Sequence, residues 1–134
     1  MNAAAVADTH AAIWYLFADP RLSASARSAF NQAGSDGRKV LVSAITLAEM
    51  VYLVEKRRIA EEVHNRLCGS LAAPEHILAE APLTAAIAES MRWIPREQVP
   101  DMPDRIVAAT ALYFNVPVIS RDSRILSSGV TTIW

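Results

Sequence analysis

Short apolar runs alternate with longer helical patterns along the whole chain. Five runs have the length of strands: residues 3–7, 40–42, 77–79, 116–119 and 131–134. A polar residue follows each of the first four, and the last reaches residue 134. They do not alternate cleanly between apolar and polar residues, so we expect strands that are buried on both faces. Such strands are typical of a parallel sheet that helices cover on both sides.

Six helices are predicted between these runs, over residues 10–18, 24–34, 46–58, 60–72, 84–93 and 104–114. Ser23 is a suitable N-cap for the second helix, and Gly34 a suitable end. The alternation of strands and helices predicts an α/β fold with a mostly parallel sheet. The length of 134 residues and the hydrophobic fraction of 52% suit one compact core, so we expect residues 1–134 to form a single domain.

The overall charge identifies no class of partner, because the formal net charge is only -1. The 13 basic residues include only two lysines, Lys39 and Lys56. Arginine pairs well with phosphate, although genome composition explains this usage equally well. The single cysteine, Cys68, suits a reducing compartment, and we see neither a signal peptide nor a membrane-spanning run. We therefore expect a cytoplasmic protein without a membrane partner.

Two aspartates lie at or just beyond the ends of predicted strands. Asp8 comes after residues 3–7, and Asp122 comes shortly after residues 116–119. Ligands of parallel α/β sheets bind beyond the carboxyl ends of the strands. If these two strands are neighbours, both carboxylates reach the same crevice. The competing explanation for Asp8 is that it only caps the following helix.

Two further acids have unusual surroundings. Glu49 is the only charged residue in the stretch 43–54, and a carboxylate on an apolar helix is costly unless it is paired or metal-bound. A position at the rim of the helix explains it equally well. Asp104 opens a predicted helix after Pro103, where helix capping is also a sufficient explanation. Carboxylates without clustered His or Cys favour Mg²⁺ or Mn²⁺.

Four segments in order make the sequence similar to a known family. They are Asp8-Thr9-His10 with Trp14 close behind, residues 42–49, residues 104–111, and residues 118–122 before a closing Ile133-Trp134. With these segments the chain resembles PIN-domain ribonucleases, in particular the VapC-type toxins of bacterial type II toxin–antitoxin modules. The resemblance spans nearly the whole chain.

This resemblance implies a PIN-like three-layer sandwich with a five-stranded sheet, and a metal-dependent endoribonuclease that cleaves RNA by means of a metal-activated water. It makes Asp8 and Asp104 the primary ligands of Mg²⁺ or Mn²⁺, in an acidic site completed by Glu49 and Asp122. Thr9 and Ser120 would be hydroxyls that orient the carboxylates. Family members usually form homodimers, and a cognate antitoxin covers the site.

Some details depart from the family or stay open. The family loop often reads Asp-Pro-x-Asp-Arg, whereas the chain has Asp101-Met102-Pro103-Asp104-Arg105, which argues against a ligand role for Asp101. Arg105, Arg121 and Arg124 are candidates for binding substrate phosphates, although pairing with a nearby acid is the simpler explanation for Arg105. The alternative function is a non-catalytic PIN-like module that binds RNA or a protein partner. The RNA and its cleavage sequence are not readable from the chain.

Overall fold

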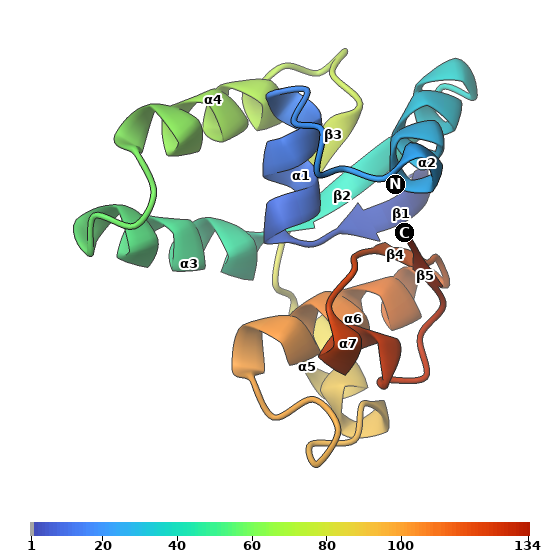
Figure 1. Ribbon diagram of the computed structural model, residues 1–134. Helices are drawn as coiled ribbons and strands as arrows, with labels where there is room; N and C mark the ends of the chain where they lie inside the picture. Colours follow the sequence, from blue (N-terminus) through green and yellow to red (C-terminus); the bar gives the residue numbers. More distant parts are fainter. Residues whose placement is uncertain (1) are drawn as a thin grey trace.

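The computed structural model describes residues 2–134 and has one parallel sheet between layers of helices (Figure 1). The strand order is β3-β2-β1-β4-β5, and every neighbouring pair is parallel. The predicted α/β fold with a five-stranded parallel sheet is thereby confirmed. The strands are β1 (Ala3–Ala7), β2 (Lys39–Ser43), β3 (Leu78–Ala81), β4 (Val118–Ile119) and β5 (Thr132–Ile133).

Seven α-helices and one 3-10 helix are found in residues 2–134, and six of the α-helices overlap the six predicted segments. They are α1 (Thr9–Leu16), α2 (Ala24–Ser35), α3 (Ala44–Glu55), α4 (Glu61–Ala72), α5 (Ala85–Ser90), the 3-10 helix η1 (Met91–Trp93), α6 (Met102–Phe114) and α7 (Ser123–Leu126). None of the helices in this part of the chain combines the length and the apolar character needed to cross a membrane.

The central strands are buried on both faces, as the unbroken apolar runs predicted. Ala5 and Val42 face one core, which is filled mainly from α1, α2 and α4. Val6 and Leu41 face a second core with side chains from α6 and α7. Figure 1 shows these two groups of helices on opposite sides of the sheet. Both cores therefore hold β1 rigidly, and Asp8 follows directly at its carboxyl end.

One local prediction was wrong, and one short helix was missed. The helix predicted to open at Asp104 begins at Met102, and its N-cap is Asp101, whose Oδ2 accepts a hydrogen bond from the Asp104 N–H at 3.0 Å. Proline is tolerated in the first turn of a helix, so Pro103 does not delay the start. The short helix α7 was not predicted, because four residues are too few for a helical pattern to be visible.

Candidate active site

The carboxyl edge of the sheet carries a cluster of acids. Since β1 pairs with β4, the residues that follow these two strands meet at one edge. A cavity of about 230 Å³ at this edge, which we call the acidic pocket, is lined by all four predicted acids and one more: Asp8, Glu49, Asp101, Asp104 and Asp122. The structure thus brings together five acids from four separate places in the chain.

Asp8 is held by two hydrogen bonds. Its Oδ1 accepts from the backbone N–H of Ala11 at 2.9 Å, which makes Asp8 the N-cap of α1. Its Oδ2 accepts from the Ser120 hydroxyl at 2.5 Å. Burial raises the pKa of Asp8 above its ordinary value and the charge of Asp122 adds to this, while the bonds from Ser120 and Ala11 oppose the rise. Asp8 therefore both caps a helix and faces the acidic pocket.

Ser120 also organises the neighbouring acid. Its Oγ accepts a hydrogen bond from the backbone N–H of Asp122 at 3.0 Å while it donates to Asp8. The carboxylate of Asp122 in turn caps α7 by accepting from the N–H of Arg124 at 2.8 Å. One buried hydroxyl thus connects the ends of β1 and β4.

Glu49 reaches the pocket from α3, which is otherwise almost entirely apolar. The Thr9 hydroxyl donates to its Oε1 at 3.3 Å. Burial is the main cause that raises the pKa of Glu49, and the charges of Asp101 and Asp8 contribute in the same direction. Thr9 and Ser120 therefore lie where hydroxyls can orient two of the four predicted acids, and their functional roles stay predictions.

Asp104 has the most strongly perturbed carboxyl group of the pocket. Burial, followed by the charges of Asp101, Asp122 and Glu49, raises the pKa of Asp104 to about 7 from an ordinary value of 3.8. Each charged neighbour named here is another acid, so repulsion disfavours its ionised form. A group of this kind is an expected ligand for a cation, which would relieve the repulsion.

Of the three arginines near the site, Arg105 binds backbone carbonyls, whereas Arg121 and Arg124 line cavities. The guanidinium of Arg105 donates to the carbonyls of Ile94 and Met91 at 2.9 and 2.8 Å, and Arg105 is not part of the pocket lining. It ties α6 to η1 instead of pairing with an acid, and we leave it out of the site proposed below. Arg124 lines the pocket, whereas Arg121 lies in an adjoining cavity.

Besides Arg124, a candidate for binding phosphate, the pocket lining includes two titratable side chains that were not predicted for the site, His10 and Asp101. The signal for His10 was its place in the first turn after β1, which points it toward the same edge as Asp8. Asp101 was discounted because of the shifted proline, yet its carboxylate lines the pocket while it caps α6.

The pocket offers oxygen ligands that suit a hard divalent cation. Within residues 2–134, no group of three or more His, Cys, Asp and Glu side chains is arranged to hold a metal ion directly. Mg²⁺ keeps several waters and is usually bound through one or two carboxylates. Asp8 and Asp104 are the residues that would hold it.

Comparison with known protein families identifies the fold family. The family model described as "PIN domain" matches residues 5–128. The chain belongs to the PIN domain family. The predicted resemblance is thereby confirmed over almost the full length of the chain.

Individual proteins similar to this PIN-domain chain carry related names. The chain is 28% identical over 130 residues to "Ribonuclease VapC22" of Mycobacterium tuberculosis, and the match covers 95% of both. Its fold is similar to that in the crystal structure of VapBC2 from Rickettsia felis bound to a promoter DNA fragment, with a TM-score of 0.69, 16% identity and 95% coverage of both chains.

Two structures of a second system have the same fold. A structure of FitAB bound to a DNA fragment matches with a TM-score of 0.59 and 21% identity, covering 95% of this chain and 92% of the other. FitAcB from Neisseria gonorrhoeae matches with a TM-score of 0.52 and 20% identity, covering 95% and 94%. At these identities the structures support the PIN fold of the chain.

Proposed function

We propose that this PIN-domain chain is the toxin of a type II toxin–antitoxin pair and an endoribonuclease that requires Mg²⁺ or Mn²⁺. The observation that carries the proposal is the gathering of five acids in the acidic pocket, where burial and the neighbouring charges raise the pKa of Asp104 to about 7. A site that only binds RNA has no use for carboxylates that face a polyanion. The name of the Mycobacterium tuberculosis relative, a ribonuclease, supports the same activity.

Each pocket residue has a role in this proposal. Asp8 and Asp104 would hold the cation, which when bound lowers the pKa of a water and polarises the phosphodiester. Ser120 keeps the Asp8 carboxylate in place, and Thr9 does the same for Glu49. Glu49 and Asp122 lie in the same pocket and are available to accept a proton from the attacking water.

The chemistry is a hydrolysis at phosphorus. The oxygen of water forms a bond to phosphorus, the bond from phosphorus to O3′ breaks, and the leaving O3′ takes up a proton. The products then carry a 5′-phosphate and a 3′-hydroxyl. The 2′-hydroxyl of the RNA is not consumed in this reaction, although it can still serve recognition.

The proposed biological setting follows from the VapC-type resemblance. An antitoxin would cover the acidic pocket, and two copies of the chain would form a homodimer in the cytoplasm. The structural neighbours VapBC2 and FitAB, both bound to DNA fragments, support this setting.

Cleavage of total RNA by the purified chain tests the enzymatic proposal. We expect activity with Mg²⁺ or Mn²⁺, none with chelator, recovery on adding back either ion, and 5′-phosphate termini. Full activity in chelator, or 2′,3′-cyclic phosphate termini, would contradict the proposed mechanism. RNA binding without cleavage under every metal condition would instead favour the alternative of a non-catalytic binding module.

A further inference from the structure

A second cavity adjoins the acidic pocket and has a different character. Its volume is about 430 Å³, and we call it the tryptophan cavity after Trp14 and Trp134 in its wall. Asp8, His10, Asp122 and Arg124 line both cavities, so the two lie side by side, and we call them together the groove. The acidic pocket carries most of the acids, whereas the tryptophan cavity adds the side chain of Arg121.

The guanidinium of Arg121 is held in place by aromatic rings. It lies 4.6 Å from the ring centroid of Trp14 and 5.9 Å from that of Trp134. The two indoles are themselves in edge-to-face contact, with centroids 5.8 Å apart. Stacking of this kind fixes the plane of a guanidinium and leaves its N–H donors free for an anion. Arg121 is exposed and, within residues 2–134, forms no salt bridge.

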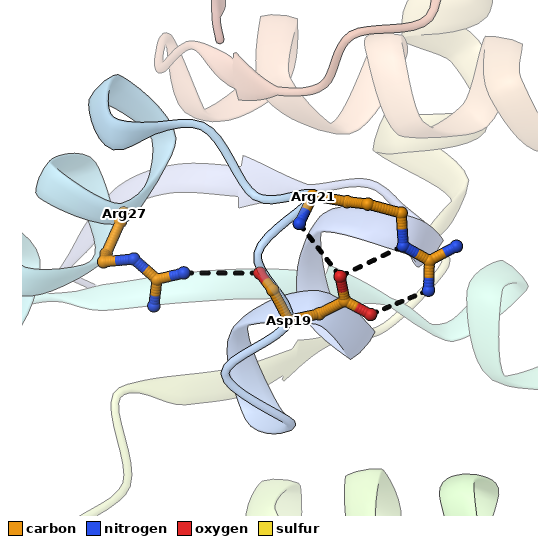
Figure 2. Close-up of polar contacts among 3 residues, drawn as sticks. All are labelled: Asp19, Arg21 and Arg27. Atoms are coloured by element: carbon orange, nitrogen blue, oxygen red, sulfur yellow. Dashed lines mark hydrogen bonds and ion pairs between the residues drawn. The ribbon is translucent and has the colours of Figure 1, made fainter.

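Arg21 shows what a neutralised arginine on the same indole looks like. Its guanidinium lies 4.7 Å from the ring centroid of Trp14, almost the same distance as that of Arg121. Its Nη2 and Nε, however, bind the carboxylate of Asp19 at 2.7 and 3.0 Å (Figure 2). This pairing uses the fork of donors that would otherwise meet a phosphate. Of the two arginines on Trp14, Arg121 is therefore the one available for substrate.

We propose that the tryptophan cavity binds the phosphate of a single-stranded RNA nucleotide next to the scissile bond, and that Arg121 and Arg124 are the side chains that bind it. The proposal rests on the ribonuclease function proposed above. The shared walls place this phosphate beside the acidic pocket, where cleavage would occur. The strand then crosses the groove with one phosphate among the carboxylates and its neighbour on the arginines.

The combination of arginine and tryptophan side chains in the groove favours single-stranded RNA. Hollows that combine arginines with aromatic side chains bind unpaired nucleotides, because the bases stack on the rings while the backbone meets the cations. Trp134 is partly exposed at the cavity and is available for such stacking. An RNA duplex keeps its bases stacked inside and presents mainly phosphates and 2′-hydroxyls.

The test measures binding of a fluorescein-labelled single-stranded 12-nucleotide RNA at several salt concentrations. The binding measurements use the Asp104→Asn background to prevent cleavage, and cleavage itself is followed in the otherwise unchanged chain. We expect Arg121→Gln to weaken binding at least about tenfold and to reduce the salt dependence of log K by about 0.7, as for one lost phosphate contact on a single strand. Arg124→Gln should act in the same direction.

Arg21→Gln is the matched control, because Arg21 packs on the same indole but is already paired with Asp19. It should leave both the affinity and the salt dependence unchanged. Arg121→Lys keeps the charge and should keep most of the salt dependence. If Arg121→Gln melts at a much lower temperature than the parent chain, Arg124→Gln decides the question alone.

The outcomes separate this inference from the proposed function. Cleavage by the wild-type chain with no effect of Arg121→Gln or Arg124→Gln would overturn the binding site and leave the ribonuclease proposal standing. An equal loss in Arg21→Gln and Arg121→Gln would also overturn it, since packing on Trp14 would then explain both. A 12-base-pair RNA duplex bound as tightly as the single strand would overturn the assignment to single-stranded RNA. Failure of the wild-type chain to bind or cleave any RNA would overturn both proposals.

Discussion

Asp8 and Asp104 face the same pocket, and burial raises the pKa of both, but hydrogen bonds oppose the rise only at Asp8. At the junction of β1 and α1, Asp8 accepts hydrogen bonds from the Ala11 N–H and the Ser120 hydroxyl, and both bonds oppose the rise of its pKa. At the start of α6, burial and then the charges of the other acids raise the pKa of Asp104 to about 7. Asp104 lies in the first turn, but the capping position belongs to Asp101.

Asp8 is therefore a ligand that is already oriented, whereas Asp104 is a ligand whose ionised form needs a nearby cation. Burial raises the pKa of Asp8 as well, but its hydrogen bonds oppose the rise and orient its carboxylate before any metal arrives. The ionised form of Asp104 is unfavourable until a positive charge enters the pocket. The three predictions below test this distinction, beginning with the largest expected effect.

Removing the charge of Asp104 should abolish catalysis, whereas removing that of Asp101 should not. We expect Asp104→Asn and Asp8→Asn each to lower kcat/KM by about 1000-fold or more, because a metal-assisted step supplies several kcal/mol. Asn caps a helix as well as Asp does, so Asp101→Asn should keep α6 intact and stay within about tenfold of wild type. Initial rates on one RNA substrate measure all three variants. A loss in Asp101→Asn as large as in Asp104→Asn would make Asp101 a ligand as well.

Much of the fold and of the pocket was predictable from the sequence, because both depend on strand ends. The run at residues 3–7 matches β1 fully, and a strand that ends at a polar residue determines where that residue lies. Asp8 and Asp122 could therefore be placed at one edge from the sequence, given that β1 and β4 are neighbours. Glu49 was identifiable because a lone acid on an apolar helix needs an explanation.

Other features depended on geometry that a sequence pattern does not contain. The capping role went to Asp101 because the helix starts before Pro103, and the residues Asp101 and Asp104 are equally good caps by type. Arg105 adjoins Asp104 in sequence, but successive residues of a helix point about 100° apart, so its side chain reaches Met91 and Ile94 instead of the pocket. The pairing of Arg121 with two tryptophans distant in sequence was likewise not readable.

The second prediction removes the hydroxyl that distinguishes Asp8 from Asp104. Ser120→Ala takes the donor from Asp8 and the acceptor from the Asp122 N–H, so both carboxylates at the ends of β1 and β4 are held less firmly. We expect the Mg²⁺ concentration for half-maximal cleavage to rise about 10- to 100-fold. Ser120→Thr keeps the hydroxyl and should stay close to wild type. The Mg²⁺ titration would speak against an orienting role if Ser120→Ala and wild type gave the same midpoint.

The third prediction concerns the stability of the metal-free protein and its dependence on pH. The folded chain holds a proton on Asp104 up to about pH 7, whereas the unfolded chain releases it near the ordinary value of 3.8. The contribution of this group to stability therefore falls as the pH rises through this interval, and it stays low above pH 7. In chelator at pH 8, Asp104→Asn should melt about 3 °C above wild type, a small gain because water screens a partly exposed group.

At pH 4 this advantage should disappear, since Asp104 is then protonated in the folded wild type. Asp8→Asn should gain less at pH 8, because Ser120 and Ala11 already stabilise the Asp8 carboxylate. Thermal melts of the three chains at both pH values give the comparison. A metal-free Asp104→Asn chain that is less stable than wild type at pH 8 would show that the carboxylate of Asp104 supports the fold.

The bond between Ser120 and Asp8 joins residues 112 positions apart, and β4 takes its place beside β1 only after nearly the whole chain exists. Contacts of such long sequence separation form late in folding. A nascent chain on the ribosome carries Asp8, Glu49 and Asp104 well before it carries Ser120 and Asp122. We expect such a chain to have no assembled catalytic centre, so that an RNA-cleaving protein is inert toward the ribosome and messenger that are still producing it.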